Sequence, residues 1–169
     1  MELDEAVKNN PHLGIYLQKF QEQTGVIPSL IPQLSRDIDN KNINIIYPVG
    51  DPLFIHLYGT QKIGIKYYVI EPELTQNEQE KYQELLGIIL RRTPEELAAD
   101  TSDKLREHFN KLLDKVTIIG RPTKSKEKVS LKEDEFKKIK YFIDRNMVSH
   151  GIIEPLVRDP YLEDIHCIG

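Results

Sequence analysis

The chain has 169 residues, of which 30% are charged, and a formal net charge of −4 at pH 7. This length suits one domain with a core, or one domain and the beginning of another. The negative balance argues against the whole chain binding nucleic acid, and no apolar run approaches the roughly 20 residues of a membrane-spanning helix. We expect no signal peptide, because the first ten residues are acidic and polar. The single cysteine, Cys167, excludes an internal disulfide and suits a reducing cytoplasm.

The first predicted element is a helix within an N-terminal arm, residues 1–40. Asn10 can cap it, Pro11 suits its first position, and Gly25 suits the residue after its last turn. Between these signals, four apolar residues recur at helical spacing: Leu13, Tyr16, Leu17 and Phe20. The stripe has two interpretations, packing on the body of the domain, which we favour, and docking on a partner.

Residues 41–72 are predicted to form a small antiparallel sheet of about three strands. The segments 42–49, 53–58 and 65–71 are rich in Ile, Val, Tyr and Phe, and glycine-containing turns separate them. Along the middle strand, successive side chains face opposite sides. We expect the core on the side of Leu53, Ile55 and Leu57. The opposite row is Phe54, His56 and Tyr58.

Three or more amphipathic helices are predicted in residues 73–158. Thr75 and Glu78 form a capping box, and Thr93 with Glu96 repeats that signature. The next apolar series fits one long helix or two stacked pieces: Leu97, Leu105, Phe109, Leu112 and Val116. A third box, Ser130 with Glu133, is predicted to open a last helix. Its apolar side and its terminating glycine are Phe136, Ile139, Ile143, Met147 and Gly151.

A basic segment lies before and within that last helix. From residue 121 to 140 there are eight Lys or Arg residues against four Asp or Glu residues. Residues 120–129 are polar and rich in turn formers, which predicts an exposed loop. The favoured interpretation is a solvated surface; the alternative is contact with an acidic partner or an anionic membrane surface. The candidate contact residues are Arg121, Lys124, Lys126 and Lys128.

No catalytic, cofactor-binding or metal-binding residue is predicted in this chain. Neither GxxxxGK[ST] nor GxGxxG occurs, and the same holds for GxSxG and HExxH. None of the five histidines lies three or four residues from another, so local metal-ligand spacing is absent. Glu163 and Asp164 are adjacent and would face opposite sides of a strand. An enzyme with a histidine site assembled from distant residues is the weakest hypothesis.

The last twenty residues, HGIIEPLVRDPYLEDIHCIG (150–169), resemble the N-terminal region of the secretion ATPase superfamily. This family comprises the hexameric motors of type II and type IV secretion, type IV pili and the archaellum, and its archaeal branch is especially similar. The matching residues are Ile153, Pro155, Leu156, Arg158, Asp159, Pro160, Leu162, Glu163, Asp164, Ile165, Cys167 and Gly169. In the motif a helix ends at a glycine, a short segment with two prolines follows, and a strand begins.

The resemblance implies an α+β fold and a docking or regulatory role. Residues 1–158 would be the first N-terminal domain, and residues 159–169 the junction and first strand of a following PAS-like domain. ATP, Mg²⁺ and the catalytic motifs would belong to the rest of the parent, a homo-hexamer, so no catalytic residue carries over. The expected partners are a membrane platform protein or adaptor and neighbouring subunits, at the cytoplasmic face of the membrane. The alternative is an autonomous adaptor or a module that binds anionic membranes through residues 121–140.

Overall fold

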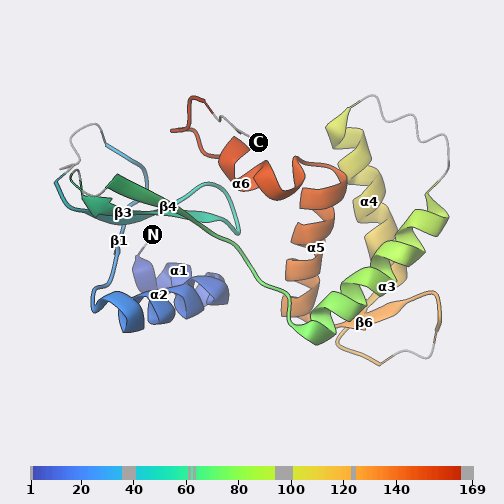
Figure 1. Cartoon of the computed structure of the whole chain (residues 1–169). Helices are drawn as coiled ribbons and strands as arrows, with labels where there is room; N and C mark the ends of the chain where they lie inside the picture. The colour runs from blue at the N-terminus through green and yellow to red at the C-terminus, as the bar shows by residue number, and fades with distance from the viewer. Residues whose placement is uncertain are drawn as a thin grey trace. The chain divides into compact units, whose positions relative to one another are not determined.

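The computed structural model describes residues 2–35, 41–60, 62, 64–93, 101–122 and 125–164. These residues form six α-helices, a four-stranded sheet and a two-stranded sheet, which confirms the α+β class and gives more sheet than predicted. The chain divides into two compact units, drawn in Figure 1. We call Met1–Pro72 with Pro155–Gly169 the sheet unit and Glu73–Glu154 the helical unit. The domain boundary at residue 158 stays a prediction.

The sheet unit is built on four strands in the order β1-β2-β3-β4. Strands β2 (Ile43–Pro48), β3 (Phe54–Thr60) and β4 (Gly64–Ile70) pair antiparallel, as the short connections predict. The additional strand, β1 (Ser29–Leu30), pairs parallel with β2. Its two residues lie in a proline-rich segment that gives no strand signal in the sequence.

Two helices cover one face of this sheet. Helix α2 (Pro11–Thr24) starts at the predicted proline and ends before Gly25, whose φ of 74° is the left-handed conformation that glycine tolerates. Helix α1 (Leu3–Asn9) precedes it. The buried cluster that these helices form with the sheet is Ala6, Leu13, Ile46, Phe54 and Ile70. The favoured interpretation of the arm's apolar stripe, packing on the body of the domain, is thus confirmed for Leu13, with Tyr16 and Leu17 packed against the same cluster.

The predicted core face of the sheet requires correction. The helices pack on the row of Phe54 and His56, not on the row of Leu53 and Ile55. Both rows are buried at this point of β3, because Leu53 and Ile55 are buried as well. The alternation of apolar and polar residues along β3 gave the wrong face because of His56. A histidine in this pattern is expected to face solvent, but Tyr16 and other aromatic side chains surround His56.

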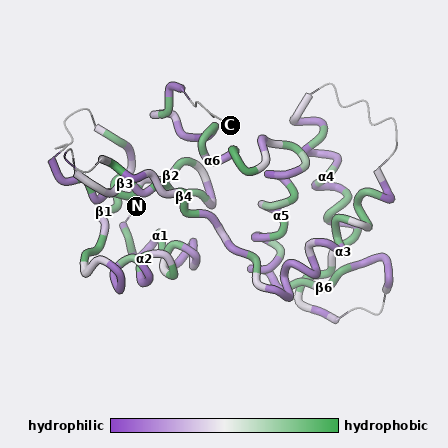
Figure 2. Tube along the Cα trace, viewed as in Figure 1, coloured by the Kyte–Doolittle hydropathy of each residue, from purple (hydrophilic) through white to green (hydrophobic). Residues whose placement is uncertain are grey.

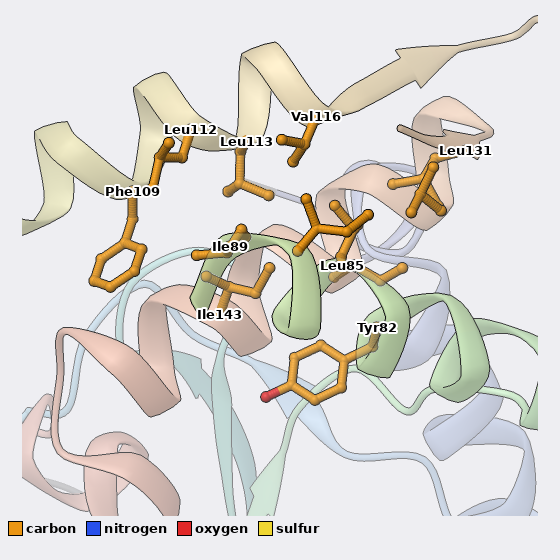
Figure 3. Packing of buried hydrophobic residues seen from close by; sticks show 12 residues of the cluster. Tyr82, Leu85, Ile89, Phe109, Leu112, Leu113, Val116, Leu131 and Ile143 are labelled. Atoms are coloured by element: carbon orange, nitrogen blue, oxygen red, sulfur yellow. The ribbon is translucent and has the colours of Figure 1, made fainter. Parts of the chain in front are cut away.

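The helical unit contains three long helices around one apolar core. They are α3 (Gln76–Arg92), α4 (Ser102–Val116) and α5 (Glu133–Met147). Figure 3 shows side chains of α4 meeting Leu85 and Ile89 of α3. The buried cluster is Tyr82, Leu85, Ile88, Ile89, Phe109, Leu112, Leu113, Val116, Val129, Leu131, Ile139 and Ile143. Figure 2 shows hydrophobic and hydrophilic residues alternating along these helices, as their periodicity predicts.

A small parallel sheet completes the helical unit. Strand β5 (Thr117–Ile119) directly follows α4, and β6 (Val129–Leu131) pairs with it in parallel. The chain then passes through α5 and a 3-10 turn, η1 (Gly151–Ile153), into the short helix α6 (Glu154–Val157).

The capping predictions have mixed outcomes. The Thr75–Glu78 box is confirmed, with Glu78 Oε2 accepting from the Thr75 N–H at 2.7 Å. Glu96 and Leu97 lie outside the described residues. Ser130 does not cap α5, because it belongs to β6; Lys132 occupies the capping position instead. Gly151 does not end α5 either: the helix ends at Met147, and Gly151, with φ of 61°, opens η1.

Candidate functional site

Among the matching residues of the resemblance motif that the structure describes, one carboxylate is buried, that of Asp159. The residue is 3% exposed. Its Oδ2 accepts hydrogen bonds from the hydroxyl groups of Tyr47 at 2.8 Å and Tyr67 at 2.7 Å. Its Oδ1 accepts from the backbone N–H of Tyr161 at 2.9 Å. A buried charge is tolerated only with such partners, so these three donors account for an aspartate at this position.

The two tyrosines reach Asp159 because of strand register. Tyr47 of β2 lies opposite Ile55 of β3, and Tyr67 of β4 lies opposite Leu57. Directly opposed residues share a face of the sheet, so both tyrosines project from the face that α1 and α2 leave uncovered. Burial raises the pKa of each tyrosine above its ordinary value, and the hydrogen bond to Asp159 raises it further. Both hydroxyl groups therefore stay protonated and donate.

Two neighbours of Asp159 tie the same turn to the sheet unit. Arg158 Nη1 donates to the carbonyl oxygen of Asp51 at 3.4 Å, in the turn between β2 and β3. The Tyr161 hydroxyl accepts from the Leu34 N–H at 3.0 Å, and its ring packs edge-on against Tyr47 with centroids 5.4 Å apart. The sequence analysis selected Arg158 and Asp159 but missed Tyr47 and Tyr67. Tyr47 and Tyr67 could have been selected only from their position on the same face of the sheet, and that position requires the strand register.

The rest of the motif shows no strand in its described part. Residues 161–164 lie in a turn and an irregular segment, with Glu163 and Asp164 exposed. The chain is still turning there, because the Leu162 N–H donates to the Asp159 carbonyl oxygen at 3.3 Å. Pro160 is exposed at the start of this turn. Ile165, Cys167 and Gly169 lie outside the described residues, so a strand farther along stays a prediction.

The basic segment begins as an exposed loop with fixed ends. Arg121, Lys126 and Lys128 are exposed, and Lys124 lies outside the described residues. The Ser130 hydroxyl donates to the Arg121 carbonyl oxygen at 2.5 Å, across the base of the loop. On the far side, Glu127 accepts from Arg92 Nη2 of α3 at 2.7 Å. Arg121, Lys126 and Lys128 therefore lie on a loop that is held at its base and on one flank.

A hollow lies at the carboxyl ends of β5 and β6. Its volume is about 250 Å³. The lining residues come from the loop base, β6 and the first turns of α3 and α5: Lys81, Gly120, Arg121, Pro122, Ser130, Leu131, Lys132 and Glu135. Within it, Lys81 Nζ donates to Glu135 Oε2 at 2.7 Å. The described lining residues thus include three basic residues and one acidic residue.

The first turns of α3 and α5 exchange ion pairs. Glu135 of α5 pairs with Lys81 of α3, and Glu78 of α3 pairs with Lys138 of α5. Each glutamate also accepts the backbone N–H at the start of its own helix. Burial raises the pKa of both carboxyl groups, but the hydrogen bonds from the lysine and the backbone outweigh it and leave each pKa below its ordinary value. Both glutamates therefore stay ionised at neutral pH.

His56 is a second buried polar group of the sheet unit. Its Nε2 lies 2.9 Å from Asn44 Oδ1, which can only accept, so Nε2 carries the proton and Nδ1 accepts from the Tyr16 hydroxyl at 2.6 Å. Burial lowers the pKa of His56 to about 4. The described residues contain no group of three or more His, Cys, Asp or Glu side chains that could hold a metal ion. His56 is thus a neutral packing residue at pH 7.

Comparison with known proteins finds uncharacterized archaeal relatives. The chain is 38% identical over 181 residues to the uncharacterized protein MJ0900 of Methanocaldococcus jannaschii, a match that covers 99% of this chain and 33% of that protein. It is 26% identical over 157 residues to the uncharacterized protein MJ1288 of the same organism, covering 90% of this chain and 58% of the relative. The chain therefore spans about a third of the first relative and under two thirds of the second. No family model matches, and among the described residues no helix is long and apolar enough to cross a membrane.

Proposed function

We propose that this chain is the N-terminal docking and regulatory part of a hexameric motor ATPase of the secretion superfamily. The parent would bind ATP and Mg²⁺ through its remaining sequence and drive a secretion, pilus or archaellum machine. This part would contact a membrane platform protein or adaptor and neighbouring subunits, at the inner face of the membrane. No catalytic role is proposed for any of its residues.

The observation that carries the proposal is the anchored turn at Arg158–Asp159–Pro160. The resemblance rests on this motif, and two of its residues attach the turn to distant parts of the chain. Asp159 accepts from Tyr47 and Tyr67 on the strands and from the nearby Tyr161 N–H, and Arg158 reaches the β2–β3 turn. Such a turn fixes the direction in which the chain leaves the sheet unit. A junction between a docking domain and a following domain requires this property.

Both relatives are uncharacterized and give no functional evidence for the proposal, but the length of one of them is consistent with it. MJ0900 matches nearly all of this chain and extends well beyond it, which leaves room for a motor domain in a protein of that length. Both relatives come from an archaeon, and the motif match is strongest in the archaeal branch of the superfamily.

Two measurements test the proposal. First, we expect the encoding gene to continue past residue 169 into a GxxxxGK[ST] segment and the longer polypeptide to hydrolyse ATP. Second, this chain alone should show no saturable binding of micromolar ATP in the presence of excess inorganic phosphate, because it lacks a glycine-rich phosphate loop. A gene without such a segment, or an inert longer polypeptide, would contradict the motor assignment.

The junction gives the proposal a mutational test in the longer polypeptide. Asp159→Asn should lower the ATPase activity that assembly stimulates, because the exit turn loses its charged acceptor. Asp4→Asn, an equal change at an exposed carboxylate outside the motif, is the matched control and should leave activity near that of the parent. If the two variants had the same ATPase activity, the turn would have no regulatory role.

The second candidate function is an autonomous adaptor or anionic-membrane module that uses residues 121–140. The exposure of Arg121, Lys126 and Lys128 favours it. Binding to vesicles that contain phosphatidylglycerol should then weaken with salt, since exposed charges are screened over about 8 Å at physiological ionic strength. Replacing Lys124, Lys126 and Lys128 by Glu should abolish sedimentation with such vesicles. If that triple variant still sedimented with the vesicles, these lysines would have no role in membrane binding and the loop would be a solvated surface.

A further inference from the structure

We propose that the hollow at the carboxyl ends of β5 and β6 is a binding site for a phosphate group. The inference concerns the helical unit alone and does not depend on the motor assignment. It also differs from membrane contact through the loop, because the residues that carry it lie at the base of the loop and at the start of α5.

The charge of the lining is the first argument. Lys81 and Glu135 form an ion pair at 2.7 Å, and Glu135 is the only carboxylate among the described residues of the lining. The Lys132 backbone N–H donates to the same Glu135 oxygen at 2.9 Å. Glu135 also interacts electrostatically with Lys132, so three cations share this one carboxylate and the described lining carries an excess of two positive charges. A phosphate monoester carries about −1.5 to −2 charge at pH 7, which matches this excess.

The chemistry of the two cations is the second argument. An arginine presents a rigid fork of N–H donors that binds phosphate oxygens in pairs, and a lysine adds a compact point charge. Arg121 directly follows the glycine at the end of β5, and Lys132 directly follows β6. Because β5 and β6 run parallel and Gly120 N–H donates to the Leu131 carbonyl oxygen at 2.9 Å, the two positions are held at the same end of the sheet.

The size of the hollow limits the ligand. About 250 Å³ is below the range of pockets that enclose a drug-sized molecule, roughly 300–1,000 Å³. It accommodates a phosphate group with a small attached group, either free or at the end of a larger molecule. The two sources that fit are a soluble phosphate compound and the headgroup of a phospholipid.

The experiment compares two pairs of neutralised cations in the full chain. The hollow variant carries Arg121→Gln and Lys132→Gln, and the matched control carries Lys126→Gln and Lys128→Gln in the exposed loop. Both lose two positive charges. Amide NMR spectra of the helical unit first establish that each variant is folded, and inorganic phosphate is then titrated at constant ionic strength.

We expect phosphate to shift the amide signals of Gly120 and Lys132 saturably in the parent chain and in the loop control. The hollow variant should bind phosphate at least about tenfold more weakly, because each charge-assisted hydrogen bond contributes enough for such a change. Vesicles that contain phosphatidic acid, whose headgroup is a phosphate monoester, then identify the source. If the vesicles bind through Arg121 and Lys132 and compete with phosphate, the ligand is a lipid headgroup. If phosphate binds and the vesicles do not, the ligand is a soluble phosphate compound.

Three results would overturn the inference. The hollow variant could bind phosphate as tightly as the parent, or phosphate binding could follow the loop pair. A glutamate-rich peptide could also bind through Arg121 and Lys132 more tightly than phosphate, which would make the ligand an acidic protein segment. None of these readouts involves ATP hydrolysis, so failure here is distinguishable from failure of the motor assignment.

Discussion

The two units hold themselves together by different chemistry. The helical unit buries a cluster of twelve residues that contains no ionisable group other than the tyrosine hydroxyl, and it keeps its glutamate–lysine pairs at the ends of helices. The sheet unit buries a neutral histidine and a charged aspartate, each satisfied by residues far away in sequence. The helical unit should therefore respond most to lost apolar volume, and the sheet unit to lost polar partners or to pH.

The largest expected effect is a cavity in the helical core. Leu85 is 0% exposed at the centre of the α3–α4 contact in Figure 3. Leu85→Ala should lower the unfolding free energy of the helical unit by about 3 kcal/mol. Leu90→Ala, on the same helix at 52% exposure, is the control and should change it by about 0.5 kcal/mol or less. Denaturant unfolding, followed through the NMR signals of each unit, measures the unfolding free energy of both variants. If the two variants lost the same unfolding free energy, α3 would not bury Leu85 in preference to Leu90.

The next effect is a pH dependence confined to the sheet unit. His56 has a folded pKa of about 4 against an ordinary value of 6.5. Between these values the folded state binds fewer protons than the unfolded state, so stability falls as the pH falls. We expect the full contribution above pH 6.5 and a loss of about 3 kcal/mol by pH 4. His56→Gln should flatten this part of the profile. If the stability of the sheet unit in the parent chain did not change between pH 6.5 and pH 4, His56 would be in contact with water rather than buried.

The helical unit should lose stability in a lower pH window. The pKa values of Glu78 and Glu135 lie below their ordinary value of 4.5 because the lysine and backbone hydrogen bonds outweigh burial. Their contribution is present above pH 4.5 and is lost as the pH falls through the folded values. At pH 7, Glu135→Gln should cost about 2 kcal/mol, the scale of a hydrogen bond to a charged group. Glu133→Gln, an exposed neighbour, is the control. Helical-unit signals that titrate together with His56 would contradict the separation of the two windows.

The smallest of these effects concerns a helix cap. Thr75→Ala removes the side chain that accepts the Glu78 N–H and should cost the helical unit about 1 kcal/mol. Thr75→Ser keeps the hydroxyl and should restore most of that stability. If Ser and Ala behave alike, the cap contributes nothing, and the start of α3 is held by the Glu78–Lys138 pair alone.

Local patterns predicted much of the fold. Pro11 and Gly25 marked the ends of α2, the Thr75 box marked the start of α3, and alternating Ile, Val and Tyr residues predicted the three long strands. These signals act within a few residues, so a single sequence contains them. The start of α5 was misplaced because Ser130 fits a cap and a strand equally well, and the pairing of β6 with β5 decides between them.

The candidate sites depend on contacts that no local pattern contains. Tyr47 and Tyr67 meet Asp159 across 112 and 92 residues, and the register of β2 and β4 alone puts them on one face. The hollow likewise needs the parallel pairing of β5 and β6, which brings Arg121 and Lys132 to one end. Sequence analysis selected Arg121 as part of a basic loop, but it gave no reason to separate Arg121 from Lys126 and Lys128.

The central claim is that Asp159 pins the C-terminal junction to the sheet unit. Amide hydrogen exchange of Asp159→Asn, compared with Asp4→Asn at an exposed aspartate outside the motif, tests it most directly. We expect faster exchange at Tyr161 and Leu162 and along β2 and β4 in Asp159→Asn, with the helical unit and the control variant unchanged. Unchanged protection of these amides, or a loss that appears in the helical unit instead, would show that the junction is held by other contacts.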